Sequence, residues 1–64
     1  MVKINGEEKN ISEKTVADYL ATTDYDLKRI AVELNGDILP KAQYVNTLLC
    51  DGDSIEIVSF VGGG

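Results

Sequence analysis

The stretch DGDSIEIV, residues 51 to 58, carries the strongest strand signal in the sequence. Its two isoleucines alternate with a glutamate and a valine, which is the two-residue period of a strand with one buried face. The Asp-Gly-Asp segment before them predicts that the chain turns just before the strand begins. Because this is the most apolar strand of the chain, we expect it to be central in a sheet and to pair beside the first strand.

Two Asn-Gly pairs, Asn5-Gly6 and Asn35-Gly36, predict two tight hairpins. Asparagine and glycine tolerate the positive φ angles that a type I′ turn requires. Segments with alternating apolar residues precede both pairs. Pro40 ends the short strand at residues 37–39 because it has no N–H to donate to a sheet. The strands expected from the two hairpins cover residues 2–4, 7–10, 30–34 and 37–39.

One helix is predicted between the hairpins. The segment TVADYL, residues 15–20, changes to the helical spacing of apolar side chains. Thr15 or Ser12 can cap its first turn, and Asp18 completes a capping pair with Thr15. The polar residues 22–24 should end the helix after two or three turns.

Two irregular connections, residues 25–29 and 41–49, complete the chain. Their apolar side chains are expected to turn into the core, namely Leu27, Tyr44, Leu48 and Leu49. The resulting order is strand, strand, helix, strand, strand, crossover, strand. This order predicts a two-layer α+β domain, with one main helix on one face of a small mixed sheet of about five strands.

Composition excludes several classes of function. A chain of 64 residues is one domain near the lower size limit for a stable core. A single cysteine, Cys50, and the absence of histidine disfavour disulfides, zinc sites and iron–sulfur clusters. The net charge of -5 disfavours nucleic acid and membrane as partners and suits a basic groove on another protein. We expect a cytoplasmic protein, since no signal peptide or membrane span is evident. We also expect the chain to be a monomer when it is alone.

Other candidate reactive groups have simpler interpretations. Cys50 is interpreted as a small, semi-buried residue before a turn, because the flanking Asp51 and Asp53 disfavour a nucleophilic thiolate. The acidic pairs Glu7-Glu8 and Asp51-Asp53 are interpreted as solvated turn residues, since no ligand set is complete enough for a metal. We therefore expect no catalytic residue and no permanently bound cofactor.

The order and spacing of these elements resemble the ubiquitin-like β-grasp fold and, more narrowly, the sulfur carrier proteins of thiamine biosynthesis. The resemblance covers essentially the whole chain, including VELNGDILP at residues 32–40 and the terminal glycines. Lys41 and Tyr44 depart from it, because the family has an arginine and often a tryptophan after the proline. Three glycines stand where many relatives have two.

The resemblance implies a β-grasp domain over residues 1–61 and a glycine tail over residues 62–64. It implies that an E1-like adenylyltransferase uses ATP to adenylate the Gly64 carboxylate. Sulfur obtained through a cysteine desulfurase then gives a thiocarboxylate, which donates sulfur to thiazole synthase. The chain would be a protein cosubstrate rather than an enzyme.

The tail and the last strand supply the predicted site. Gly62 and Gly63 lack a Cβ and could thread through a narrow channel, and three extended residues reach roughly 10 Å. Val58 and Phe60 should face away from the core and dock a partner. The residues expected to surround them and meet basic residues of that partner are Glu56, Asp51 and Asp53.

Two alternative functions remain open. The related small subunit that supplies sulfur to molybdopterin has the same chemistry but is usually a longer chain. A ubiquitin-like modifier or interaction module would act through surface recognition, and deletion of Gly63 and Gly64 would then leave partner binding intact.

Overall fold

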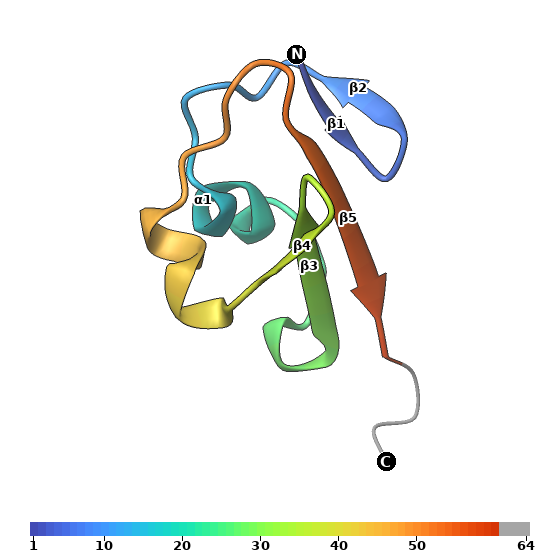
Figure 1. Cartoon of the computed structure of the whole chain (residues 1–64). Coiled ribbons are helices and arrows are strands. Elements are labelled where there is room, and N and C mark those ends of the chain that lie inside the picture. The colour runs from blue at the N-terminus through green and yellow to red at the C-terminus, as the bar shows by residue number, and fades with distance from the viewer. Residues whose placement is uncertain (61–64) are drawn as a thin grey trace.

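In the computed structural model, which describes residues 1–60, five strands form one mixed sheet (Figure 1). The order β2-β1-β5-β3-β4 places β5 in the centre, parallel to β1 and antiparallel to β3. The predicted fold class and the central position of the last strand are thus confirmed. The strands are β1 (Val2–Ile4), β2 (Glu7–Lys9), β3 (Ile30–Leu34), β4 (Asp37–Leu39) and β5 (Ser54–Ser59).

Both Asn-Gly pairs form the predicted hairpin turns. The φ angles are 49° and 86° at Asn5 and Gly6, and 51° and 90° at Asn35 and Gly36. A type I′ turn requires positive φ at both central residues, and this backbone follows the right-handed twist of the flanking strands. The turns fix the registers of β1 with β2 and of β3 with β4.

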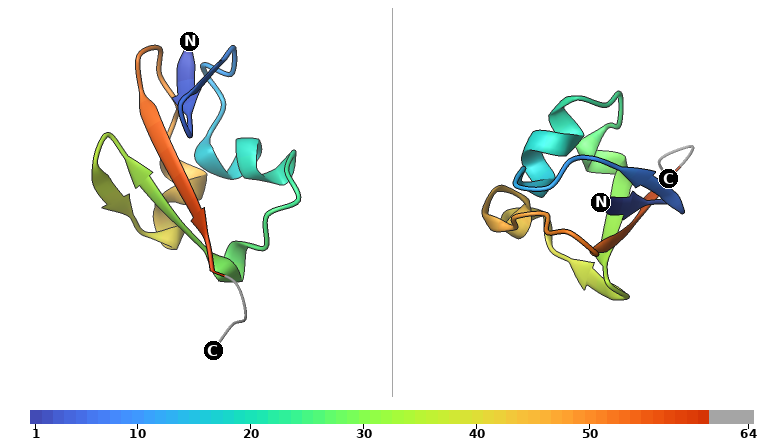
Figure 2. Two further views of the ribbon diagram at one scale, coloured as in Figure 1. Left: turned by 90° about the vertical axis from the view of Figure 1, so that its right-hand side faces the viewer. Right: turned by 90° about the horizontal axis from the view of Figure 1, so that it is seen from above.

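A single α-helix, α1 (Val16–Ala21), forms the second layer of the part described. Thr15 caps it, as predicted: its hydroxyl accepts a hydrogen bond from the N–H of Asp18 at 3.0 Å, and the Asp18 carboxylate accepts one from the N–H of Thr15 at 3.4 Å. Two 3₁₀ helices, η1 (Leu27–Arg29) and η2 (Lys41–Asn46), occupy the connections. Figure 2 shows α1 and η2 next to each other, where they pack together.

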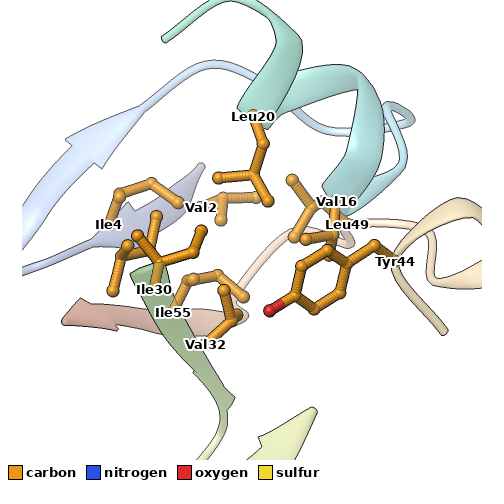
Figure 3. Packing of buried hydrophobic residues seen from close by; sticks show 10 residues of the cluster. Val2, Ile4, Val16, Leu20, Ile30, Val32, Tyr44, Leu49 and Ile55 are labelled. Atoms are coloured by element: carbon orange, nitrogen blue, oxygen red, sulfur yellow. The ribbon is translucent and has the colours of Figure 1, made fainter. Parts of the chain in front are cut away.

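The core lies between α1, η2 and the inner face of the sheet (Figure 3). Tyr44 and Leu49 are buried there, as predicted, and Figure 3 shows the Tyr44 ring beside Leu49 and Val16. Burial raises the pKa of the Tyr44 phenol above its usual value. The buried apolar residues are Val2, Ile4, Val16, Leu20, Ile30, Val32, Tyr44, Leu49, Ile55 and Ile57.

Two predicted core residues are exposed instead. Leu48 is 52% exposed because it forms an extended β-bridge with Thr15, and successive side chains of extended backbone point in opposite directions. Burial of Leu49 therefore turns Leu48 outward. Leu27 is 45% exposed at the start of η1, while the neighbouring Tyr25 packs against the core.

Candidate functional site

The central strand β5 leads into residues 61–64, which lie outside the described part of the chain. The roles predicted for Gly62, Gly63 and Gly64 fall there, as does the predicted boundary between domain and tail. The structure describes β5, which precedes these residues, and the surface around the C-terminal end of this strand. The geometry of β5 up to Phe60 therefore defines the candidate site.

Two asparagine side chains, one from each hairpin turn, form hydrogen bonds with β5 and the residue before it. The Asn5 carboxamide accepts a hydrogen bond from the N–H of Ile57 at 2.7 Å and donates one to its carbonyl at 3.3 Å. Asn35 accepts from the N–H of Ser54 at 2.9 Å and donates to the Asp53 carboxylate at 3.1 Å. Each Asn-Gly turn thus also supplies a side chain that holds the central strand.

A backbone hydrogen bond holds the chain just after the C-terminal end of β5. The N–H of Phe60 donates to the carbonyl of Arg29, the last residue of η1, at 2.6 Å. η1 is itself held by Asp26, whose carboxylate accepts from the N–H of Lys28 at 3.0 Å and pairs with the Arg29 side chain at 3.6 Å. The chain is therefore fixed in the sheet as far as Phe60.

The outer face of β5, opposite the helix, carries the predicted docking residues Glu56 and Val58, and the third, Phe60, directly follows the strand. Val58 is 50% exposed and Phe60 is 55% exposed, whereas Ile55 and Ile57 are buried on the inner face. The alternation predicted from the sequence is therefore confirmed. Half-exposed apolar side chains at the end of a central strand are suited to contact another protein.

The other two predicted docking residues lie at the opposite end of β5. Asp53 accepts hydrogen bonds from the N–H of Cys50 at 2.9 Å and from Asn35, and so stabilises the turn before the strand. Asp51 forms an ion pair with the N-terminal amine. At about 3.3 Å per residue, Asp53 and Phe60 are separated by roughly 23 Å of strand. The structure therefore does not bring the two aspartates together with Val58 and Phe60.

One acidic residue of the outer face was missed by the sequence reasoning. Glu33 on β3 lies directly opposite Glu56 on β5, and Ala31 lies opposite Val58. The alternation of β3 already placed Glu33 on its outward face. Its pairing with Glu56 depends on the register between β3 and β5, which are separated in the sequence by residues 35–53.

Cys50 is exposed, which corrects the expectation of a semi-buried residue. The turn that Asp53 closes leaves the cysteine on its surface. Within residues 1–60, the side chains of aspartate, glutamate and cysteine form no group of three or more that could hold a metal ion. None of the helices in this same range is long and apolar enough to cross a membrane.

The ThiS family matches residues 2–64. This chain belongs to the ThiS family. It is 47% identical over 62 residues to a thiazole synthase of Paramagnetospirillum magneticum, a match that spans 95% of this chain but only 19% of that protein. It is 41% identical over 66 residues to the sulfur carrier protein ThiS of Bacillus subtilis, and the match spans the whole of both chains.

A solved ThiS structure has the same fold. The crystal structure of the thiamine biosynthesis protein ThiS from Geobacter metallireducens superimposes with a TM-score of 0.81 at 30% identity, covering 98% of this chain and 97% of that one. The resemblance inferred from the hairpins, the capped helix and the last strand is thereby confirmed.

Proposed function

We propose that this chain is the sulfur carrier for thiazole formation in thiamine biosynthesis, with the Gly64 carboxylate as the group that changes chemically. The observation that carries the proposal is the ThiS family match over residues 2–64, which includes all three glycines. End-to-end similarity to a ThiS protein named as a sulfur carrier supports it. A related segment within a thiazole synthase supports that enzyme as the sulfur acceptor.

The proposed chemistry explains why the carrier needs partner enzymes. A carboxylate is a poor electrophile, so one of its oxygens first attacks the α-phosphate of ATP and releases pyrophosphate. The terminal sulfur of a persulfide formed on a cysteine desulfurase then attacks the carbonyl of the acyl adenylate, and AMP leaves with that oxygen. A thiol reduces the resulting acyl disulfide, which gives the thiocarboxylate and a disulfide. An E1-like adenylyltransferase provides the site, a cysteine desulfurase provides the sulfur, and thiazole synthase consumes the thiocarboxylate. The carrier acts in the cytoplasm as their cosubstrate.

The described part of the chain supports this role through the end of β5. The Phe60–Arg29 hydrogen bond fixes the point from which the glycines continue. Val58 and Phe60 offer an apolar contact at that point, and Glu56 lies next to them on the same face. Asp51 and Asp53 would contact only a partner that extends along the whole strand. Gly62 and Gly63 would carry the carboxylate into the partner's active site because they lack a Cβ.

Mass spectrometry of the intact protein tests the proposal. Incubation with the E1-like adenylyltransferase, ATP and a sulfur source should replace one oxygen with sulfur, a gain of about 16 Da. Fragmentation should place the gain on Gly64. A variant that ends at Gly62 is the matched control and should show no gain. The proposal is contradicted if the intact chain gains no mass with either a thiamine-type or a molybdopterin-type activating enzyme.

A further inference from the structure

The outer face of the sheet carries two cross-strand pairs of charged residues, and only one of these pairs combines opposite charges. Lys3 on β1 lies opposite Glu8 on β2, so a cation faces an anion. Glu33 on β3 lies opposite Glu56 on β5, so two anions face each other. Directly opposed like charges destabilise a sheet, whereas opposite charges stabilise it. The same face therefore places opposite charges across from each other at one position and like charges at another.

No cation within residues 1–60 neutralises the glutamate pair. The ion pairs in this part of the chain join Asp51 to the N-terminal amine, Glu7 to Lys9, and Asp26 to Arg29. Neither Glu33 nor Glu56 takes part in any of them. The ion pairs of this part of the chain therefore leave both carboxylates available to a cation of another molecule.

Exposed apolar side chains lie on both sides of the glutamate pair. Val58, the next outward residue on β5, is 50% exposed. Ile38 on β4 lies opposite Glu33 and is 74% exposed. A partner that covers these two side chains would also remove water from the carboxylates between them. Removal of water strengthens an interaction between opposite charges.

We infer that Glu33 and Glu56 form the electrostatic part of the docking site for the activating enzyme, and that this enzyme places a lysine or arginine between the two carboxylates. The inference rests on the proposed function. An arginine fits especially well, because its planar guanidinium can donate to two carboxylates at once. The activating enzyme binds the carrier before it is modified. This enzyme must therefore distinguish the carrier from other proteins that end in glycine. The repulsion between the glutamates is relieved only in the complex.

Steady-state ATP–pyrophosphate exchange, measured as a function of carrier concentration, tests this inference. The variants are Glu33→Gln, Glu56→Gln and their combination. Glu8→Gln is the matched control, because it removes one negative charge from the same face outside the proposed site. The double variant should raise KM for the carrier about tenfold and leave kcat unchanged, while the control should change KM less than about twofold. The double variant should also weaken the dependence of KM on salt.

Thermal unfolding of the same variants gives a second, independent readout. Loss of either glutamate relieves the repulsion and should raise Tm, whereas Glu8→Gln removes an attractive pair and should not. A gain in Tm together with a loss of affinity distinguishes a binding residue from one that merely supports the fold.

Several results would overturn the inference. One is an unchanged KM for the double variant while the wild-type chain is activated normally, which would leave the proposed function intact. Others are an equal rise in KM for Glu8→Gln, a defect confined to sulfur transfer to thiazole synthase, or a carrier dimer that the variants dissociate. Absence of any adenylation of the wild-type chain would overturn the proposed function together with this inference.

Discussion

The side chain of Asn5 hydrogen-bonds to both backbone groups of Ile57, a residue 52 positions later in the chain. It does so from a backbone with a φ of 49°, at the first central position of a type I′ turn. One asparagine therefore shapes the first hairpin and joins it to the central strand. β1 ends at Ile4, so the carboxamide continues the pairing where the backbone of β1 turns away.

Substitution of Asn5 by glycine should lower the free energy of unfolding by about 1–3 kcal/mol, because the backbone groups of Ile57 lose their partner. Glycine tolerates the positive φ, so this variant isolates the two side-chain hydrogen bonds. Asn5→Ala should cost roughly 1 kcal/mol more, because alanine adds backbone strain. Urea unfolding measures both values. Equal free energies of unfolding for the wild type and Asn5→Gly would show that the Asn5 carboxamide does not stabilise the fold.

The adjacent leucines of the crossover should respond very differently to truncation. Leu49 is fully buried, so Leu49→Ala should cost roughly 2–5 kcal/mol and leave a domain of this size largely unfolded. Leu48→Ala is the matched control and should change stability by less than about 0.5 kcal/mol, because this side chain is exposed. Circular dichroism at increasing urea concentration measures both variants. Similar losses would contradict the outward position of Leu48.

Truncation of the apolar residues at the end of β5 should weaken partner docking without unfolding the domain. Val58→Ala combined with Phe60→Ala should raise KM for the carrier in the adenylation reaction about tenfold, which corresponds to a combined loss of about 1.4 kcal/mol of binding free energy. Val45→Ala is the control, since Val45 is also exposed but lies on η2. A KM equal to that of the control, with Tm unchanged, would contradict the docking role.

Alkaline pH should destabilise the fold through Tyr44. Burial raises the pKa of this phenol in the folded state, whereas in the unfolded chain it titrates near its usual value of about 10. Above that pH the unfolded chain releases a proton that the folded chain retains, so the free energy of unfolding falls until the folded state also ionises. Tyr44→Phe should remove this part of the decline. Urea unfolding at pH 7 and at a series of higher pH values measures it, and identical slopes for both proteins would contradict the assignment.

Regular segments could be predicted from the sequence because their periodicity determines which way each side chain points. Alternation in residues 54–59 predicted the buried and exposed faces of β5, and the Asn-Gly pairs predicted both turns. Thr15 and Asp18 were recognisable as a cap because the hydrogen bonds join residues only three positions apart. In all these cases local chemistry and the global fold favour the same conformation.

Irregular segments could not be predicted in the same way. Leu27 and Leu48 lie in connections without a repeating period, so hydrophobicity alone predicted burial and was wrong for both. We expected Asp51 and Asp53 to lie around Val58 and Phe60, but the length of an extended strand separates them. The pairing of Glu33 with Glu56 was missed because register between distant strands is set by the packing of the whole sheet.

The parallel pairing of β1 with β5 has a mechanical consequence. Lys3 is in register with Ser54, and Ile4 with Ile55, so a pull on the chain beyond Phe60 acts along the strand axis. Hydrogen bonds loaded in this shear direction share the force and must break together, whereas bonds at the end of a peeled strand break one at a time. The carboxamide of Asn5 adds two more bonds to this clamp. A domain built in this way resists unfolding when force is applied to the end of its central strand.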